Sequence, residues 1–359
     1  MKISLTKTQR PKVKPLDETS LGFARTFTDH MFIVEYEADR GWFDPRIVPY
    51  QNLSLNPASP VFHYAQEIFE GAKAYSLDNG EVGLFRIADN ARRMNRSAER
   101  MCMPGLDVDL QVQAIERLVD LDRDWVPKSE GTSLYLRPTM IADGSSLGAH
   151  TATRFIYFII ASPTGSYYQQ GSKPIRIRIE TRHVRAVKGG VGRAKTGGNY
   201  AASFKASYEA KAEGYNEVLW LDGRQQRFVQ EVGAMNMVFV VDGKLVTSEL
   251  GDTILPGITR DSVLTLAREK GMEIVEGQIA VDYLFEAYDQ GLLTEAFGTG
   301  TAAVISPVGE LTWKDRTMTL NDNVIGPVSQ MFYDELVGIQ RQRLADDHGW
   351  TSLVPRYNP

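Results

Sequence analysis

The residues most suited to chemistry are a lysine flanked by glycines, since residues 192–200 read GRAKTGGNY. Glycine has no Cβ, so the backbone around Lys195 can come close to a flat ligand. Tyr200 follows at the start of a predicted helix, where its phenol can point back toward the amine. An exposed loop lysine is the commoner fate of such a residue. The glycines and the phenol instead favour a covalent partner with a reactive carbonyl.

A phosphate-binding P-loop is a competing interpretation of GGVGRAKT, residues 189–196. That motif requires a second glycine where this chain has Ala194. It also requires a firm helix directly after the lysine, where this chain has Gly197 and Gly198. Both differences argue against a nucleotide-hydrolysing enzyme, which would show magnesium-dependent ATP turnover. A non-catalytic binding protein would show neither that turnover nor a chromophore.

If the carbonyl partner is pyridoxal 5'-phosphate, the chain must also supply a carboxylate for the pyridine nitrogen and a phosphate site. Glu231 follows a predicted strand and is a candidate for the carboxylate, although an exposed strand glutamate is the commoner case. LPGITRDSV turns directly into a helix and points the amides of Ile258 and Thr259 toward an anion. A helix end contributes only about 0.3 to 1 kcal/mol. Arg93 and the hydroxyl of Thr301 are therefore candidates for further phosphate contacts.

Composition describes a folded protein without a general affinity for polyanions. The 359 residues allow two domains, and 43% hydrophobic with 24% charged residues is typical of a soluble globular chain. A formal charge of -5 gives no attraction to nucleic acid or anionic membranes. Cys102 is the single cysteine, which excludes an internal disulfide and a thiolate metal cluster. We therefore expect a cytoplasmic protein with no metal ion, nucleic acid or membrane as partner.

Strand and helix patterns predict an α/β first part and a second part richer in strands. We expect a small α/β domain over 1–163, an interdomain linker over 164–176 and a larger domain over 177–359. Asp-Gly pairs at 222–223 and 242–243 predict hairpin turns. The predicted helices, set by apolar spacing and by stop signals such as Gly271, cover 89–101, 200–214, 259–270 and 328–344.

Seven segments taken together resemble the branched-chain amino acid aminotransferases of class IV. They are FEGAKAY (69–75), ARRMNRSA (91–98), SLYLRP (133–138), AKTGGNYAAS (194–203), EVGAMN (231–236), LPGITR (255–260) and FGTGTAA (297–303). The segments occur in order over nearly the whole chain, which makes the resemblance specific. It implies the mixed α/β, two-domain fold of class IV pyridoxal-phosphate (PLP) enzymes, with a β pseudo-barrel in the larger C-terminal domain. It also implies a homodimer with a shared active site.

The resemblance further implies roles for the residues at matching positions. Lys195 would hold the cofactor covalently, Tyr200 would bond its ring oxygen and Glu231 its pyridine nitrogen. The residues that would hold the phosphate are Arg93, Ile258, Thr259 and Thr301. Those that would hold the substrate's α-carboxylate are Tyr135 and the amides of Thr301 and Ala302. Those that would line the apolar side-chain pocket are Phe69, Tyr64 and Tyr167. Leu147 and Ala149 would reach the neighbouring subunit's site.

The expected reaction is reversible, ping-pong transfer of the amino group of leucine, isoleucine or valine to 2-oxoglutarate. Its products are the branched-chain 2-oxo acid and glutamate. Arg137 matches the group that receives glutamate's distal carboxylate, which would cost several kcal/mol to bury unpaired. A D-amino acid aminotransferase or an aminodeoxychorismate lyase would share the cofactor residues and differ in the pocket.

Two departures from the family pattern limit what the resemblance implies. Many long members have a hydroxyl residue where this chain has Ala234. Animal members carry a CxxC redox pair where this chain has Ala303 and Ser306, so that regulation cannot occur here.

Overall fold

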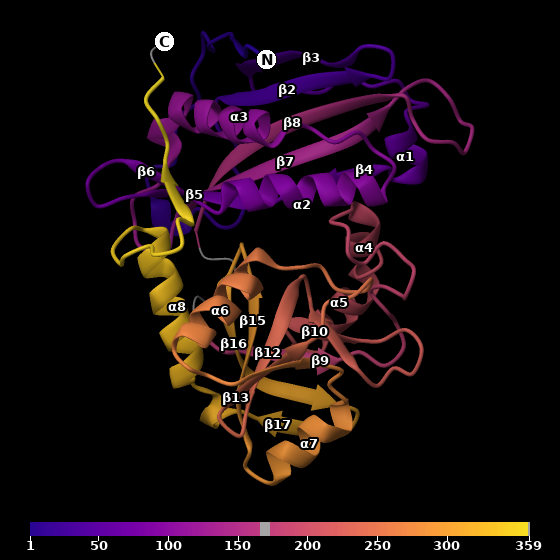
Figure 1. Ribbon diagram of the computed structural model, residues 1–359, viewed down its shortest axis with the longest axis vertical. Coiled ribbons are helices and arrows are strands. Elements are labelled where there is room, and N and C mark those ends of the chain that lie inside the picture. Colours follow the sequence, from indigo (N-terminus) through magenta and orange to yellow (C-terminus); the bar gives the residue numbers. More distant parts are fainter. Residues whose placement is uncertain (166–172, 358–359) are drawn as a thin grey trace. The chain divides into compact units, whose positions relative to one another are not determined.

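The computed structural model describes residues 1–165 and 173–357, which form two compact units (Figure 1). Unit 1 contains residues 1–165, 338–357 and a short return that we call the lysine segment, residues 194–197. Unit 2 contains residues 173–193 and 198–337. This differs from the division expected from sequence, which placed everything after residue 176 in the second domain. The expected linker at 164–176 overlaps 166–172, which lie outside the described residues.

Unit 1 is built on one sheet in the order β1-β3-β2-β8-β7-β5-β6-β18, with β4 paired to β7. All described pairings are antiparallel except that of β1 with β3. The strands are β1 (Ser4–Leu5), β2 (His30–Glu37), β3 (Gly41–Pro49), β4 (Glu67–Phe69), β5 (Ala72–Ser76), β6 (Val82–Phe85), β7 (Ser133–Asp143), β8 (Arg154–Thr164) and β18 (Thr351–Leu353). The return of β18 to pair with β6 brings the chain's last segment into unit 1.

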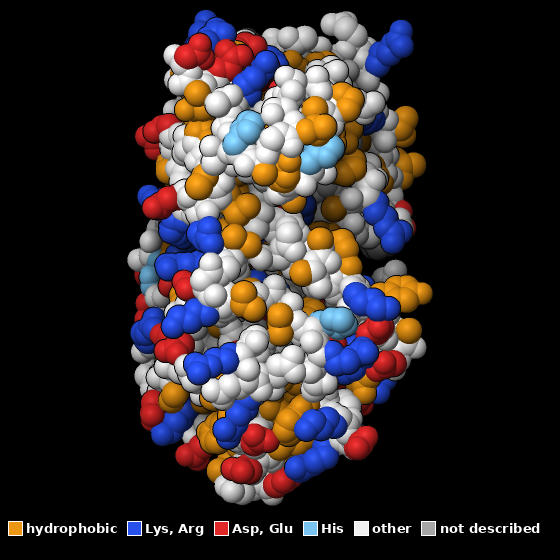
Figure 2. Space-filling model, turned by 90° about the vertical axis from the view of Figure 1, so that its right-hand side faces the viewer, with side chains coloured by type: hydrophobic (Ala, Val, Ile, Leu, Met, Phe, Trp, Pro, Cys, Tyr) orange, Lys and Arg blue, Asp and Glu red, His pale blue; other side chains and the backbone are white. Residues whose placement is uncertain are grey.

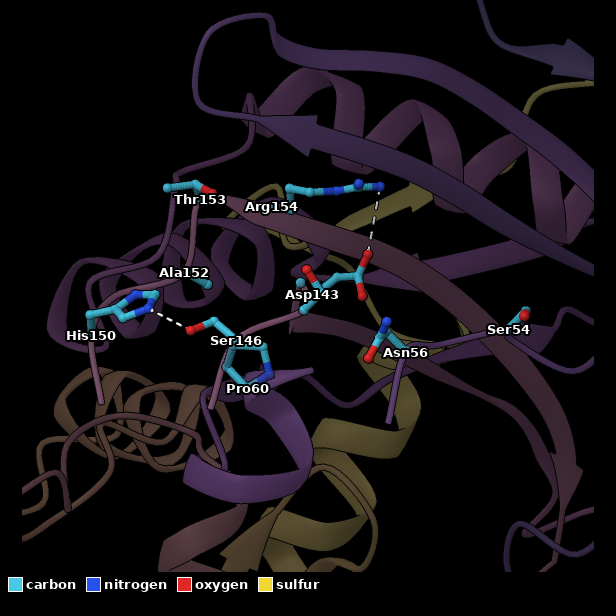
Figure 3. A pocket seen from close by; sticks show the side chains of 11 residues that line it. Ser54, Asn56, Pro60, Asp143, Ser146, His150, Ala152, Thr153 and Arg154 are labelled. Carbon is cyan, nitrogen blue, oxygen red and sulfur yellow. Dashed lines mark hydrogen bonds and ion pairs between the residues drawn. The ribbon is translucent and has the colours of Figure 1, made fainter. Parts of the chain in front are cut away.

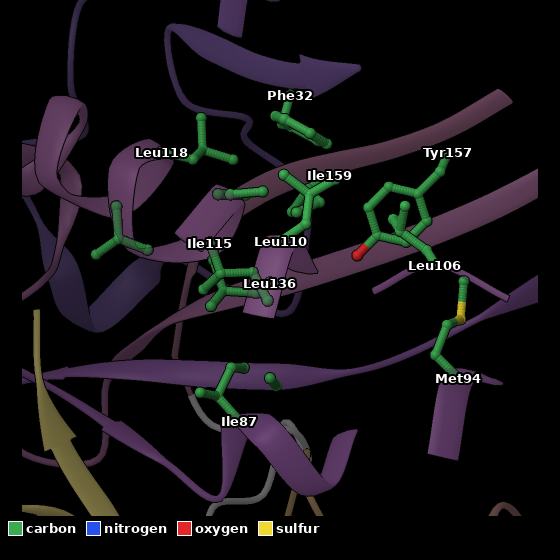
Figure 4. Close-up of a cluster of buried hydrophobic side chains, with 14 of the residues drawn as sticks. Phe32, Ile87, Met94, Leu106, Leu110, Ile115, Leu118, Leu136, Tyr157 and Ile159 are labelled. Carbon is green, nitrogen blue, oxygen red and sulfur yellow. The ribbon is translucent and has the colours of Figure 1, made fainter. Parts of the chain in front are cut away.

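Two helices cover one face of this sheet, α2 (Ile87–Arg100) and α3 (Val108–Leu121) (Figure 1). The carboxylate of Asp107 caps α3 by accepting a hydrogen bond from the amide of Leu110 at 2.9 Å. The apolar residues of α3 recur at helical spacing and meet the sheet in a continuous core (Figure 4). Its members include Phe32, Ile87, Met94, Leu106, Leu110, Ile115, Leu118, Leu136, Tyr157 and Ile159. A short helix, α1 (Pro60–Tyr64), starts with Pro60 in its first turn.

Unit 2 is built on a second sheet, ordered β11-β10-β9-β16-β15-β12-β13-β14, with β17 paired to β16. Because β11 also pairs with β12, the strands from β11 to β12 close into a barrel, which confirms the predicted pseudo-barrel. The strands are β9 (Ile175–Ile179), β10 (Glu217–Leu221), β11 (Val229–Val232), β12 (Met235–Val241), β13 (Lys244–Ser248), β14 (Ile274–Gly277), β15 (Leu293–Gly300), β16 (Val304–Trp313) and β17 (Arg316–Thr319).

Of the two predicted Asp-Gly hairpins, one has the expected two-residue turn. Asp242 and Gly243 have φ values of 51° and 73°, and Val241 pairs directly with Lys244. The other hairpin joins β10 to β11 through a longer loop, residues 222–228. Its loop is organised by the Asp222 carboxylate, which accepts hydrogen bonds from the amides of Arg224, Gln225, Arg227 and Phe228.

The remaining helices are α4 (Gly197–Ala201), α5 (Phe204–Ala212), α6 (Ile258–Glu269), α7 (Val281–Asp289) and α8 (Pro327–Gln340). The single helix predicted over 200–214 is thus broken between α4 and α5. The predicted helix over 259–270 is present as α6, and Gly271 follows it with a φ of 71°. Within the described residues, no helix combines the length and the apolar character that crossing a membrane requires.

Candidate active site

In unit 1 the lysine segment lies beside β4. The amide of Phe69 donates to the carbonyl of Lys195 at 3.0 Å, and the amide of Lys195 donates to the hydroxyl of Ser97 on α2 at 3.0 Å. The hydroxyl of Thr196 donates to the carbonyl of Glu67 at 2.7 Å. These bonds fix the backbone from which the lysine side chain extends. The Lys195 Nζ lies 4.9 Å from the centroid of the Phe69 ring.

Tyr135 and Arg137 lie on the same face of β7, because side chains two residues apart on a strand point the same way. Phe69 of β4 pairs with Thr139 of β7 and so shares this face. Arg137 donates from Nη2 to the Tyr135 hydroxyl at 3.0 Å, and its Cζ lies 4.7 Å from the Phe69 ring centroid. Its Nε is buried and has no hydrogen-bond partner within the described residues. This buried donor could serve an incoming carboxylate.

Arg93, which we expected at the phosphate, forms a buried ion pair with Glu70. Its Nε and Nη2 donate to the two oxygens of Glu70 at 2.7 and 2.8 Å. Burial alone would raise the pKa of Glu70, but Arg93, together with Lys195 and Asn90, lowers it below its ordinary value. Glu70 is the glutamate of FEGAKAY, and we did not assign it from sequence. Its place beside Phe69 in that motif was the available signal.

The loop between β7 and β8 carries Leu147 and Ala149 and borders an open pocket of about 500 Å³ (Figure 3). Hydrogen bonds hold the loop at both ends. Asp143 accepts from the hydroxyl of Ser59 at 2.9 Å and lies 3.7 Å from the Arg154 guanidinium. Within the loop, the Ser146 Oγ and the His150 Nε2 form a hydrogen bond of 3.0 Å. The hydroxyl of Tyr64 on α1 donates to the Leu147 carbonyl at 2.5 Å, so two predicted site residues are joined directly.

The side chains of this loop and of α1 are largely exposed in the single chain. Leu147 is 65% exposed, Phe62 61% and Tyr64 43%. On the face shown in Figure 2, hydrophobic side chains gather around the histidines of unit 1, where Lys, Arg, Asp and Glu are sparse. An exposed apolar group of this kind suits contact with another protein surface.

In unit 2, Glu231 is a buried and firmly held carboxylate rather than an exposed strand residue. It lies on β11 with 3% of its surface exposed. One oxygen accepts from the amide of Leu255 at 2.6 Å and the other from the Nε of Arg185 at 2.7 Å. Arg185 also donates to the carbonyl of Gly192 at 3.1 Å. Sequence reasoning missed Arg185, since a single arginine far from Glu231 in the chain gives no pattern to recognise.

The start of α6 lies directly after the contact with Glu231. Gly257 occupies the N-cap position and supplies no side-chain cap to the amides of Ile258 and Thr259. The side-chain amide of Asn236 donates to the carbonyl of Leu255 at 2.9 Å. A Cβ at Gly257 would lie 1.9 Å from the Asn236 Oδ1, so this approach requires glycine. Leu255, which bonds Glu231 through its amide, therefore fixes the spacing between the carboxylate and the helix end.

The other predicted residues of unit 2 lie on a turn and on α4. Thr301 and Ala302 belong to the turn between β15 and β16, where Gly300 pairs with Val304. Thr299 directly precedes Gly300. Its hydroxyl is buried and has no hydrogen-bond partner in the described part of the chain. Tyr200 lies on α4 and is half-buried. Tyr167 lies outside the described residues.

The chemistry of these groups fits pyridoxal 5'-phosphate. Such a cofactor needs an amine for its aldehyde, a carboxylate for its ring nitrogen and donors for its phosphate. Lys195 in unit 1 is an amine of this kind, and unit 2 contains the Glu231 carboxylate and the N-terminus of α6, so each function has a candidate. Across residues 1–165 and 173–357, no three His, Cys, Asp or Glu side chains lie so that they could hold a metal ion.

Comparison with known proteins gives matches over nearly the whole chain. The family model of class IV aminotransferases matches residues 67–311. The chain is 48% identical to branched-chain-amino-acid aminotransferase 2 of Bacillus subtilis, over 99% of this chain and 97% of that protein. The branched-chain amino acid aminotransferase of Escherichia coli superposes with a TM-score of 0.75 at 25% identity, covering 90% of this chain and 99% of that one. The enzyme of Thermobaculum terrenum, solved in its PLP form, gives 0.72 at 26% identity, covering 90% and 98%.

Proposed function

The chain belongs to the class IV aminotransferase family, and we propose that it transfers the amino group of leucine, isoleucine or valine to 2-oxoglutarate. The products are the branched-chain 2-oxo acid and glutamate. Pyridoxal 5'-phosphate is the cofactor, and when bound it supplies an electron sink for negative charge at the substrate's α-carbon. One observation carries the proposal. The Arg137 guanidinium and the Lys195 amine lie over the same apolar ring, that of Phe69.

Lys195 has two tasks in this reaction. Its amine would hold the cofactor between turnovers, and its Nζ, when released from the cofactor, would accept the proton from the substrate's α-carbon. The hydrogen bonds to Phe69 and Ser97 keep the lysine backbone in place throughout. Only the side chain therefore has to move between the two tasks.

Glu231 keeps a proton on the ring nitrogen by accepting a hydrogen bond from it. Leu255 and Arg185 already hold both carboxylate oxygens of Glu231. The Glu231 side chain therefore needs little rearrangement when negative charge develops at the substrate's α-carbon. The N-terminus of α6, with Ile258, Thr259 and the turn at Thr301, holds the phosphate. Arg93, which is paired with Glu70 in unit 1, is the candidate for the cation that a phosphate also requires.

Two different substrates must use one pocket, which accounts for the ping-pong order. Tyr135, with the amides of Thr301 and Ala302, binds the α-carboxylate common to both substrates. Phe69 and Tyr64 contact the branched side chain of the first substrate. Arg137 binds the distal carboxylate of the second through a bidentate or charge-assisted hydrogen bond.

A second copy of the chain completes the site. Leu147 and Ala149, on the loop whose hydrophobic side chains are exposed in the single chain, reach the pocket of the neighbouring subunit. The expected assembly is therefore a homodimer. Light scattering on the purified protein checks it, and a monomer with full activity would contradict this part of the proposal.

An assay with leucine and 2-oxoglutarate tests the proposal directly. We expect glutamate and the 2-oxo acid of leucine in equal amounts, and comparable turnover with isoleucine and valine. After borohydride reduction, mass spectrometry should find the cofactor on Lys195, and Lys195→Ala should lose both the attachment and the turnover. Faster reaction with D-alanine, or release of pyruvate from aminodeoxychorismate, would instead identify one of the other two class IV activities.

A further inference from the structure

Glu67 lies at the predicted pocket and has no part in the reaction described above. It is on β4 two residues before Phe69, so both side chains leave the same face of the strand. Ile68 between them faces the core and is fully buried. The cross-strand partner of Glu67 is Ile141 of β7, four residues from Arg137 on the same face. The Glu67 carboxyl therefore shares a sheet face with Phe69, Tyr135 and Arg137.

The Glu67 carboxyl is held in place by the lysine segment. Its Oε1 accepts a hydrogen bond from the amide of Gly197 at 2.5 Å, while its own carbonyl accepts from the hydroxyl of Thr196. A Cβ at Gly197 would lie 2.0 Å from that Oε1, so the carboxyl occupies the space that any other residue would need at position 197. The Glu67 carboxyl is thus held at Gly197, two residues after Lys195 in the chain, and does not rotate freely.

Among the charged groups of this face, Arg137 is the one that acts on Glu67. The guanidinium of Arg137 lies over the Phe69 ring, and its buried Nε has no hydrogen-bond partner among the described residues. Burial raises the pKa of Glu67 above its ordinary value, while the Gly197 amide and the charge of Arg137 oppose that rise. The carboxyl therefore interacts electrostatically with Arg137.

We propose that Glu67 is a specificity-determining residue whose fixed carboxylate competes with the distal carboxylate of the acidic substrate for the charge of Arg137. When an apolar side chain occupies the pocket, Glu67 offsets the positive charge of Arg137. When glutamate or 2-oxoglutarate binds, the same carboxylate repels the second one and limits its affinity. One pocket can then hold both substrate classes with comparable affinity. This inference rests on the proposed function, since it assumes an acidic and an apolar substrate.

Glu67→Gln tests this proposal because glutamine keeps the oxygen that accepts from Gly197 and removes only the charge. Equilibrium binding to the holoenzyme can be measured with two unreactive acids, glutarate and 4-methylvalerate. We expect glutarate to bind about threefold to tenfold more tightly to the variant, as removal of one nearby like charge predicts. The affinity for 4-methylvalerate should stay within about twofold. Glu99→Gln, an exposed position on α2, is the matched control and should change neither affinity.

Steady-state kinetics and a double variant separate this role from simple positioning of the lysine segment. In Glu67→Gln we expect a lower KM for 2-oxoglutarate, an unchanged kcat and no decrease in the KM for leucine. The gain for glutarate should disappear when Arg137→Ala is also present, because the effect acts through Arg137. Equal changes for both ligands, or a fall in kcat alone, would overturn the proposal. If the natural chain does not transaminate leucine with 2-oxoglutarate at all, the proposed function fails first and this inference fails with it.

Discussion

The two units contain different kinds of candidate site group. Unit 1 supplies side chains on the faces of β4 and β7, such as Phe69, Tyr135 and Arg137. Unit 2 supplies a buried carboxylate, a helix end and a turn, so that much of its contribution comes from backbone amides. A side chain on a strand face can be replaced without disturbing the backbone hydrogen bonds between strands. The position of a backbone amide, in contrast, is set by the fold itself. We infer that the choice between side chains depends on unit 1, through Phe69 and Arg137, whereas Glu231 and the N-terminus of α6 in unit 2 act alike with every substrate.

The lysine segment is the exception to the order of the chain. Residues on both sides of it belong to unit 2, yet Lys195 is bound to β4 and α2 of unit 1. The backbone of Lys195 is thereby held by the same strand that carries Phe69. Substitutions on β4 can therefore affect both the amine and the pocket, and those in unit 2 should affect neither selectively.

Glu231→Gln should give the largest effect and should affect both half-reactions alike. The amide cannot hold a proton on the ring nitrogen as the carboxylate does, and it leaves the buried Arg185 without its ion-pair partner. We expect kcat to fall by about a hundredfold or more with leucine and with glutamate, the scale seen when one preorganised electrostatic group is removed. Single-turnover measurements of each half-reaction check this. Glu231→Asp, which keeps the charge, should recover part of the loss.

A loss confined to one substrate in Glu231→Gln would break the division between the units. It would mean that unit 2 also takes part in choosing the side chain. The Thr299 hydroxyl, buried and without a partner in the described chain, would then be the next group to test in unit 2.

Arg137→Ala should give the opposite signature, a loss for the acidic substrates alone. Removing a charge-assisted hydrogen bond of about 1.5 to 3 kcal/mol should raise the KM for 2-oxoglutarate and glutamate roughly tenfold to a hundredfold. The KM for leucine should change by less than about threefold, since its side chain has no charge to pair. Arg137→Lys keeps the charge but loses the planar guanidinium. Its KM for 2-oxoglutarate should therefore lie between those of the natural protein and of Arg137→Ala. Equal effects on leucine and glutamate would contradict the assignment of Arg137.

Sequence patterns located the elements of the fold where local chemistry decides the structure. The Asp242-Gly243 turn needs positive φ at both positions, which these residues tolerate, and α6 stops where Gly271 can adopt positive φ. The long loop after Asp222 was not predictable as such, because its length depends on hydrogen bonds that one carboxylate accepts from four amides of the loop. Asp-Gly alone indicates a turn and leaves the length of the loop undetermined.

Motifs in the sequence yield candidate site residues, which remain a prediction, whereas the contacts that these residues make could not be predicted. The resemblance pointed to Arg93 and Glu231. Their ion-pair partners, Glu70 for Arg93 and Arg185 for Glu231, lie 23 and 46 positions away in the chain. The same holds for Glu67, whose contact with Gly197 spans 130 positions. Pairs at such separations arise from the tertiary fold, and no periodicity in a single sequence records them. The return of the lysine segment to unit 1 is unpredictable for the same reason.

Glu217 offers a way to change the stability of unit 2 alone. It lies on β10 against Gly233, and burial raises its pKa to about 7, with Lys211 opposing the rise. The folded state thus binds a proton more tightly than the unfolded state, whose carboxyl titrates near its ordinary value of 4.5. Stability should therefore fall as the pH rises from about 4.5 to about 7 and remain lower above that range.

Glu217→Gln should remove this pH dependence and stabilise unit 2 by about 1 to 2 kcal/mol at pH 8. Hydrogen exchange measured at pH 5 and pH 8 would report the change for each unit separately. Glu286→Gln, an exposed position on α7, is the control. If protection in unit 1 rises by the same amount, the two units unfold together, and the prediction that Glu217 affects the stability of unit 2 alone is wrong.

Tyr157→Phe is the counterpart in unit 1 and should have the smallest effect. The Tyr157 side chain is fully buried in the core of Figure 4, and its hydroxyl has no hydrogen-bond partner within the described residues. Removing an unpaired buried hydroxyl while keeping the ring should stabilise unit 1 by about 1 kcal/mol, because the cost of desolvating that hydroxyl disappears. Tyr357→Phe is the matched control, since the Tyr357 hydroxyl donates to Glu116 at 2.8 Å and its loss should destabilise the same unit. Hydrogen exchange along β7 and β8 measures both changes. A loss of protection in Tyr157→Phe would show that a buried water satisfies the hydroxyl and that the polar group contributes to this core.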